Sequence, residues 1–445
     1  MCLIIAIFEL ARHIKMSYYK RTADALLCKL LEAFGAVLIE GPKWCGKTTT
    51  AAQIAGSVIQ LQDPDMRAEY QATALSKPSL LLNGKTPRLI DEWQDIPVLW
   101  DAVRAQVDIR NIPGQFILTG SNAINKSEIL HSGVGRIARM RMMPMSLWES
   151  QDSTGSVSLK ELFDNPDYDI DGKTSNLRIE DLIFLASRGG WPASLQTRSK
   201  SSQLLIAKKY VQSLCVDDIT RVDGKRRDSL TTKMILKSYA RNISTLAKKK
   251  TLIEDILSSG EVSLSRDTFD DYEKALQQLF IIQNIEAWSP AIRSKTAIRS
   301  NPKRSFCDPS ISVAMLGLSP DALSTQLRTF GFVFEQMCVR DLRAYTIGSG
   351  SHISYYHDRY GLEVDYVLHL DDGRYALIEC KLGSREIDSG AEHLLEVRRL
   401  ISEHNAGETQ VPIKEPDLLL ILTGGNTAYT RLDGVKVVPL GCLKD

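Results

Sequence analysis

The chain of 445 residues lacks several features that would assign a protein to a special class. It has no long apolar run: the N-terminal stretch Cys2–Phe8 has only seven such residues, too few for a membrane-spanning helix, and it matches a signal peptide poorly. Met16 is an alternative start that would make residues 1–15 an appendage. The chain also lacks a charge excess, because 55 Lys and Arg face 54 Asp and Glu. The whole chain therefore has no general electrostatic attraction for nucleic acid or an anionic membrane.

The eight cysteines lack the spacing of a metal or disulfide framework. None forms a C-x-x-C pair and none clusters with histidines. This pattern excludes a typical structural zinc site and a disulfide-stapled fold, and it predicts a cytoplasmic protein whose cysteines act as small hydrophobic residues.

Length and composition predict a globular protein without a membrane span and with about three domains, since 43% of its residues are hydrophobic and 24% charged. Short apolar runs alternate with helical patterns in the first and last blocks, whereas the middle is mainly helical. The predicted parts are an N-terminal extension (1–17), a P-loop parallel αβα domain (18–150), an acidic connector (151–177), a helical lid and winged-helix region (178–325) and a C-terminal α/β domain (326–445).

Charge is concentrated in two oppositely charged segments. Residues 149–181 hold nine acidic and three basic residues, which predicts a solvated connector with at most one short helix. Residues 221–250 hold ten basic and two acidic residues, and residues 293–304 add five basic residues and no acid. Two interpretations of the basic segment remain open: a local surface for a nucleic-acid backbone, or a solvated face that also contacts the acidic connector.

A phosphate-binding pattern lies between a predicted strand, Gly35–Glu40, and a predicted helix, Thr48–Ala55. The sequence Gly-Pro-Lys-Trp-Cys-Gly-Lys-Thr at 41–48 fits G-x-x-x-x-G-K-[ST]. Glycines in such a loop let backbone N–H groups surround anionic oxygens. Lys47 would contact the β- and γ-phosphates, and Thr48 would bind Mg²⁺. The nucleotide-binding residues are predicted to be Gly41, Trp44, Cys45, Gly46, Lys47, Thr48 and Thr49.

Two further predicted strands, Arg88–Asp91 and Gln115–Thr119, end in polar residues suited to the same site. Asp91 would hold Mg²⁺, with Thr48, and Glu92 would polarise the attacking water. The candidates for a γ-phosphate sensor are Ser121 and Asn122. The candidate arginine finger is Arg136, with Arg139 as second choice.

These motifs together resemble a known group, the prokaryotic AAA+-type P-loop ATPases that carry a C-terminal domain of unknown function. The resemblance rests on Tyr19-x-Arg21, the loop at 41–48, Ile-Asp-Glu-Trp-Gln-Asp-Ile-Pro at 90–97, Leu-Thr-Gly-Ser at 118–121, Gly135-Arg136 and Gly-Gly-Trp-Pro at 189–192. It covers nearly the whole chain. The usual Arg-Gln in the loop is Lys43-Trp44 here, a change at positions that act through their backbone.

The resemblance implies a winged helix in the middle block, and residues 243–282 fit one. A first helix would begin at Ser244, a connecting helix would end at Leu257, and Ser265–Phe280 would be the recognition helix, followed by a basic wing at 290–304. The recognition helix is acidic, with Asp267, Asp270, Asp271 and Glu273, so phosphates would repel it. DNA recognition by this helix is disfavoured.

The C-terminal block has a predicted hairpin, with strands at 361–370 and 374–381 joined by Asp-Asp-Gly. A helix at 385–403 and strands at 417–423 and 435–439 follow. Asp365 and the Glu379-x-Lys381 pair resemble the PD-(D/E)XK nuclease fold, which implies that Asp365 and Glu379 hold Mg²⁺, that Lys381 orients water and that Glu335 assists from a preceding helix. The usual proline before the aspartate is absent, since Glu363-Val364 stands there.

The sequence thus predicts an ATP-binding, Mg²⁺-dependent ATPase of AAA+/switch type with a nuclease-like C-terminal domain. The alternative is a nucleotide-regulated interaction protein whose C-terminal domain is catalytically inactive. The expected ligands are ATP and Mg²⁺, the expected partners are nucleic acid at a local basic surface, another protein or further copies of the chain, and no membrane is expected.

Overall fold

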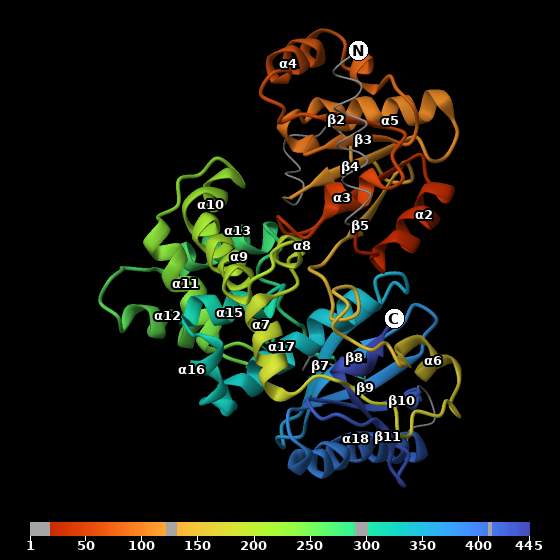
Figure 1. Cartoon of the computed structure of the whole chain (residues 1–445), viewed down its shortest axis with the longest axis vertical. Coiled ribbons are helices and arrows are strands. Elements are labelled where there is room, and N and C mark those ends of the chain that lie inside the picture. Colours follow the sequence, from red (N-terminus) through yellow and green to blue (C-terminus); the bar gives the residue numbers. More distant parts are fainter. Residues whose placement is uncertain (1–17, 122–130, 289, 291–300, 408–411) are drawn as a thin grey trace. The chain divides into compact units, whose positions relative to one another are not determined.

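The computed structural model describes residues 18–121, 131–288, 290, 301–407 and 412–445 (Figure 1). The chain divides into two compact units. The first takes in the chain up to Pro144 with the short segments 222–224 and 278–280, and the second takes in the remainder. Within the residues described, no helix is long and apolar enough to cross a membrane.

The first unit is built on a five-stranded sheet of order β2-β3-β4-β1-β5, in which every neighbouring pair is parallel. Every residue of β1 and β4 is buried, and because side chains alternate along a strand, both faces of these central strands are covered. This confirms the predicted P-loop α/β domain. The elements are α2 (Ala23–Ala33), β1 (Ala36–Glu40), α3 (Lys47–Ala52), β2 (Ser57–Gln60), α4 (Arg67–Ser76), β3 (Arg88–Asp91), α5 (Val98–Arg110), β4 (Phe116–Gly120) and β5 (Ile137–Arg141).

The core of the first unit is fixed mainly by α5. Its buried residues Leu99, Trp100, Val103 and Val107 recur every three to four positions, so they form one face of the helix. Trp100 also packs against Trp93, with ring centroids 5.0 Å apart. These side chains pack against residues of β1, β3 and β4 in one core. The carboxyl ends of these three strands carry the candidate site.

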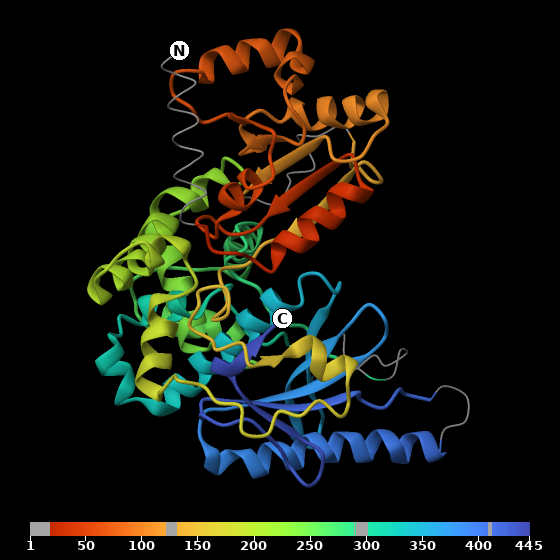
Figure 2. The same cartoon turned by 45° about the vertical axis from the view of Figure 1, so that its right-hand side comes forward.

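The second unit contains a six-stranded sheet of order β11-β12-β10-β9-β8-β7. The hairpin β8–β9 is antiparallel, as predicted, and β9–β10 and β10–β12 are parallel. Helix α17 packs on one face of this sheet and α18 on the other, where Figure 2 shows the long blue helix running beneath the strands. The elements are α17 (Leu327–Tyr345), β7 (His352–His357), β8 (Glu363–His369), β9 (Tyr375–Lys381), α18 (Ile387–Gly407), β10 (Leu418–Thr423), β11 (Tyr429–Thr430) and β12 (Lys436–Pro439).

The remainder of the second unit is largely helical, in agreement with the periodicity of the middle block. Its larger core includes residues of α7 and α15 together with α17 and the sheet. The elements are α7 (Ile179–Arg188), α8 (Pro192–Leu195), α9 (Lys200–Ser213), a π-helical turn (Leu214–Asp218), α10 (Ile219–Arg221), α11 (Ser229–Arg241), α12 (Lys249–Leu257), α13 (Arg266–Gln278), α15 (Pro309–Leu316) and α16 (Pro320–Ser324).

The helix expected to begin at Ser244 is not formed. Residues 244–248 are turn and irregular structure, Ser244 has φ +57°, and the helix before α12 is α11. Local bonds explain the turn, because the Thr245 hydroxyl donates to the carbonyl of Asn242 and the amide of Ser244 donates to the carbonyl of Arg304. Most of the predicted wing falls at 291–300, outside the described residues, so the winged helix stays a prediction.

The acidic connector is not a solvated segment, contrary to expectation. It forms β6 (Val157–Ser158), which pairs with β13 (Leu443–Lys444), and α6 (Leu159–Asp164). Val157, Leu162 and Ile170 are buried in the core of the second unit. Apolar side chains between the acidic ones anchor this segment. The net charge of residues 149–181, on which the prediction rested, does not take these apolar residues into account. The single short helix agrees with the prediction.

The acidic helix α13 is neutralised by the basic segment that precedes it. Asp271 pairs with Lys225 and Arg227, and Glu273 pairs with Lys249 at 2.6 Å. Arg304 pairs with Glu273 as well, and it is fully buried. Opposite charges that are separate in sequence are therefore paired within the second unit, and the basic segment contacts α13 where the connector had been expected.

Candidate functional site

The phosphate loop joins the end of β1 to the start of α3 and needs glycine at two positions. Gly41 has φ +152°, and a Cβ there would lie 2.2 Å from the carbonyl oxygen of Met142. Gly46 has φ +101° and precedes the first residue of α3. Both conformations disfavour other residues. The close approach of Met142 lets the loop turn directly out of the sheet.

Lys47 lies inside this loop. Its side chain is almost fully buried, and its Nζ donates to the carbonyl oxygens of Gly41 and Pro42, at 3.0 Å each. A lysine ammonium is a compact charge with three donors. The loop therefore presents a fixed positive charge at the place where the sequence predicted phosphate contact.

Three neighbouring strands bring their polar ends together beside Lys47. The hydroxyls of Thr48 and Thr119 both donate to Oδ1 of Asp91, at 2.6 Å each. Asp91 ends β3, Thr119 lies near the end of β4, and Thr48 is the second residue of α3, which follows β1. Burial raises the pKa of Asp91, and the two hydroxyl bonds act in the opposite direction.

The oxygens of Thr48 and Asp91 suit a magnesium ion. Hydroxyl and carboxylate oxygens are hard donors, which Mg²⁺ prefers, and it is usually held by one or two protein ligands together with phosphate oxygens and water. The two oxygens are 2.6 Å apart in the structure. The residues present therefore fit the predicted ion.

Glu92 is held beside Asp91 by a strained backbone and a short network. Its φ is +53°, and its amide donates to the hydroxyl of Thr119. Its Oε2 accepts from the hydroxyl of Ser121 at 3.0 Å and from the side-chain amide of Gln94. Ser121 thus positions Glu92 in this structure. The other sensor candidate, Asn122, lies outside the described residues.

Arg136 lies at the opposite edge of the sheet from the phosphate loop. It precedes Ile137, which pairs with Ala36 at the start of β1, whereas the loop follows Glu40 at the other end. Five strand residues span about 13 Å. The Arg136 guanidinium pairs with Asp108 at 2.8 Å. It cannot serve as a finger for the loop of its own chain, and its use on another copy remains a prediction.

The second finger candidate, Arg139, is engaged elsewhere. Its guanidinium lies over the ring of Trp100, 5.5 Å from the centroid. The arginine that β5 brings to the loop edge is Arg141, which pairs in register with Glu40. Arg141 was not predicted from the sequence, although the register of a parallel strand next to β1 would place it beside Glu40.

Arg21 holds the phosphate loop through hydrogen bonds, a role that was not predicted from the sequence. Its guanidinium donates to the carbonyl oxygens of Cys45, at 2.8 Å, and of Met143, at 2.7 Å, and it is buried. Nearby, the hydroxyls of Tyr18 and Thr50 lie 3.0 Å apart. The only signal was the Tyr19-x-Arg21 motif, which carried a resemblance but no role.

The second predicted site lies at the β8–β9 hairpin of the second unit. The Lys381 ammonium pairs with Glu379 at 2.5 Å, and His393 of α18 lies 3.5 Å from the other oxygen of Glu379. The amide of Cys380 donates to Oδ2 of Asp365 at 2.9 Å. Glu335, on α17, faces the same region, so the structure brings the four predicted residues together around one hairpin.

Lys303 occupies the centre of this group. Its Nζ lies 2.8 Å from Glu335, 3.2 Å from Glu363 and 3.2 Å from Asp365, and its side chain is 1% exposed. The sequence analysis counted Lys303 as part of a surface basic run, and nothing in its local sequence indicated burial. The cluster of Lys303, Glu335, Glu363 and Asp365 is called the Lys303 cluster below.

Burial and the charges of neighbouring groups shift the pKa values of the residues in the Lys303 cluster. Burial opposes the charge of Lys303, yet the attraction of the carboxylates outweighs it and raises the lysine pKa well above its usual value. Burial, reinforced by Asp365, raises the pKa of Glu335 to about 8. Burial acts against the charge of Asp365 as well, but Lys303 and Lys381 prevail and lower its pKa.

The cluster does not fit the divalent ion that the nuclease resemblance implied. The Lys303 ammonium fills the space between Glu335 and Asp365, and Glu379 is paired with Lys381. Across the described segments there is no group of three or more His, Cys, Asp or Glu that could hold a metal ion. The prediction that Asp365 and Glu379 hold Mg²⁺ stays a prediction, and the arrangement of these side chains does not favour it. The reason is a cation contributed by the chain itself.

A groove of 740 Å³ borders the Lys303 cluster. Glu335, Asp365 and Lys381 form part of its wall, and Arg328 and Arg385 lie in it as well. The groove is thus lined by charges of both signs.

Comparison with known families assigns the first unit. Residues 33–151 match a family described as "AAA domain", so this part of the chain is a P-loop ATPase domain. Residues 179–322 and 330–443 match two domains of unknown function, DUF8612 and DUF4143.

Two uncharacterised proteins, from Mycobacterium bovis and Mycobacterium tuberculosis, are each 25% identical over 325 residues. The matched region covers 72% of this chain and 65% of each relative.

Similar solved structures include a Walker-type ATPase of Pyrococcus abyssi, with a TM-score of 0.40 and 13% identity over 67% of this chain and 96% of that one. Drosophila ORC bound to DNA has a TM-score of 0.21 and 9% identity over 70% of this chain and 94% of that one.

Proposed function

We propose that the first unit is a Mg²⁺-dependent ATP hydrolase of AAA+/switch type. The observation that carries this proposal is the convergence of Thr48, Asp91 and Thr119 beside Lys47, at the ends of three adjacent strands. A carboxylate and a hydroxyl next to a fixed ammonium are the groups that phosphoryl transfer to water requires. The AAA-domain match to residues 33–151 supports nucleotide binding.

Each residue of the site has a proposed role. Loop amides from Gly41 to Thr49, with Lys47, bind the phosphates, and Thr48 and Asp91 bind Mg²⁺. When bound, Mg²⁺ supplies positive charge to the β- and γ-phosphate oxygens. Glu92 accepts a proton from the attacking water, and the hydrogen bond from Ser121 fixes the position of its carboxylate.

ATP hydrolysis by the full chain tests this proposal directly. We expect Mg²⁺-dependent phosphate release by the wild type, lost with EDTA and reduced at least 100-fold in Lys47→Ala and Glu92→Gln. Glu92→Gln should still bind ATP, because its carboxylate acts on water. Lys29→Ala, an exposed lysine on α2, is the matched control. Equal rates in all four proteins would refute the proposal.

We infer a second function for the other unit: recognition of a partner by a catalytically inactive domain, under control of the nucleotide state. The specific support is Lys303, whose ammonium pairs with Glu335 and Asp365, two of the carboxylates that a nuclease metal site would use. Cleavage of plasmid and single-stranded DNA with Mg²⁺ or Mn²⁺ tests the inference. Cleavage that disappears in both Glu379→Ala and Lys381→Ala would instead establish a nuclease.

A protein partner or a further copy of the chain fits the second unit better than nucleic acid. Five basic residues of the segment 221–250 form ion pairs within the unit: Lys225, Arg227, Arg241, Lys249 and Lys250. Each pair reduces the charge available to phosphates. Measurement of DNA binding at low and high salt tests this inference. No binding at either salt concentration would agree with it, and binding that weakens steeply as salt rises would contradict it. Localisation in the cytoplasm remains a prediction.

A further inference from the structure

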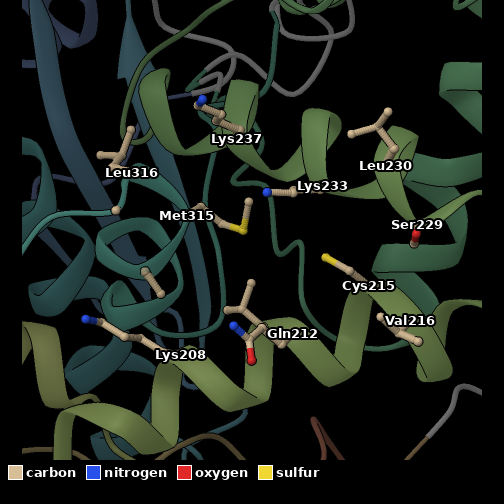
Figure 3. A pocket seen from close by; sticks show the side chains of 13 residues that line it. Lys208, Gln212, Cys215, Val216, Ser229, Leu230, Lys233, Lys237, Met315 and Leu316 are labelled. Atoms are coloured by element: carbon tan, nitrogen blue, oxygen red, sulfur yellow. The ribbon is translucent and has the colours of Figure 1, made fainter. Parts of the chain in front are cut away.

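The helical part of the second unit contains a pocket that the proposed function does not use. Its volume is 650 Å³, and its walls come from α9, the π-helical turn, α11 and the end of α15 (Figure 3). Figure 3 shows Gln212, Lys233 and Met315 facing the middle of the pocket from three different helices. Small-molecule sites in proteins typically have volumes of about 300–1,000 Å³ and mainly apolar walls.

The pocket combines apolar walls with a single sign of charge. Three of its lining residues are lysines and none is acidic. Among the residues that the structure describes, the side chains of Lys208, Lys233 and Lys237 make no hydrogen bond or ion pair, and those of Lys208 and Lys233 are exposed. The apolar part of the lining consists of Val211, Val216, Leu230, Ala314, Met315 and Leu316.

The unpaired lysines distinguish this pocket from the other basic part of the unit. Two lysines near α13, Lys225 and Lys249, are neutralised by its carboxylates. Lys233 and Lys237 lie four residues apart on α11, where like charges repel and destabilise the helix slightly. An anion in the pocket would remove this repulsion.

The wall nearest to Lys233 includes an unusual backbone element. Leu214–Asp218 forms a π-helical turn at the end of α9, and it places Cys215 and Val216 in the lining. Such turns are rare and occur often at functional sites. Burial raises the pKa of the Cys215 thiol to about 11, so it remains protonated and contributes an apolar, unreactive surface.

We propose that this pocket binds a small organic anion with an apolar body, such as an alkyl or aryl carboxylate, sulfonate or phosphate ester. The anionic group would pair with Lys233, aided by Lys237 and Lys208. The hydrocarbon part would lie against Val211 and Met315. Charge complementarity and volume both favour this ligand class over a neutral molecule or a cation.

Fluorescence titration of the full chain with 8-anilinonaphthalene-1-sulfonate tests the proposal, because this probe has an aromatic body and a sulfonate. We expect one saturable site, weakened at least tenfold in Lys233→Glu/Lys237→Glu. The control is the double variant Lys29→Glu/Lys274→Glu, since it makes the same charge change at exposed positions of α2 and α13. Dodecanoate should displace the probe more effectively than dodecanol of the same chain length.

A second variant keeps the test independent of folding defects. Val216 is 63% exposed, so Val216→Glu should fold normally, as circular dichroism can check, and should weaken probe binding by adding a negative charge at the wall. Binding that is unchanged in both the lysine variant and Val216→Glu would overturn the proposal. Equal displacement by dodecanoate and dodecanol would overturn it too, because it would show an apolar site without charge selectivity.

Discussion

Replacement of Lys303 by methionine is the sharpest test of how the second unit is built. Methionine keeps the apolar stem of the side chain and removes the ammonium that lies within 3.2 Å of Glu335, Glu363 and Asp365. The carboxylates would then face one another without a cation. Removing one partner of a buried ionic group typically costs about 3–5 kcal/mol, because the remaining charges stay buried.

We expect Lys303→Met to lose about 4 kcal/mol of unfolding free energy in the second unit, at the centre of that range. For a unit of this size the loss corresponds to a fall in Tm of about 6–7 °C. Calorimetry of the full chain with and without ATP assigns the transitions, since a nucleotide bound to the first unit shifts only that transition. Lys250→Met, an exposed lysine paired with Glu254 at 3.7 Å, is the control and should change little.

Two additional measurements separate a central cation from an ordinary buried lysine. Asp365→Asn in the Lys303→Met background should recover part of the lost stability, because it removes one uncompensated carboxylate. Lys303→Ala should gain stabilisation by millimolar Mn²⁺, whereas the wild type should show none, because the freed oxygen atoms are suitable ligands. Equal stability of Lys303→Met and Lys250→Met would refute the reasoning.

Three further predictions concern single residues. Arg21→Ala should raise KM for ATP at least tenfold, with a smaller change in kcat, as steady-state kinetics can check. The Arg21 guanidinium holds the phosphate loop, and a hydrogen bond from a charged group contributes about 1.5–3 kcal/mol. Gly41→Ala should abolish nucleotide binding measured by calorimetry, because its Cβ would lie 2.2 Å from the carbonyl oxygen of Met142. Glu335→Gln should flatten the pH dependence of stability. A carboxyl group whose pKa is raised to about 8 stabilises the folded state at low pH, and this contribution is lost as pH rises. In urea unfolding, the wild type should therefore lose about 2–3 kcal/mol of unfolding free energy between pH 6 and pH 8.

The sequence predicted the first unit well because its signals are local. The strand Arg88–Asp91 has the predicted bounds, and the phosphate loop lies between a strand and a helix as its motif requires. Parallel strands bring their carboxyl ends to one edge, so Asp91 and Thr48 could be paired in advance. The position of Arg136 could not be judged in the same way, because it depends on the register of β5 against β1.

The missed residues act over long separations in the sequence. Arg21 contacts a carbonyl 122 residues away, at Met143, and Lys303 contacts the side chain of Asp365, 62 residues away. Neither belongs to a periodic pattern or a motif with a known chemical role. Burial of a charged side chain is favourable only where folding supplies its partners, and composition or spacing cannot show which partners those are.

Many of the acidic and basic residues that balance in the total charge of the chain form short-range ion pairs within the second unit. Arg227 and Lys225 pair with Asp271, and Lys303 pairs with Glu335, so the basic segments are neutralised by side chains distant in sequence. The pocket between α9 and α11 differs from these regions, because its lining contains three lysines and no acidic residue. The anion that we propose would therefore supply the counter-charge that the lining of this pocket lacks.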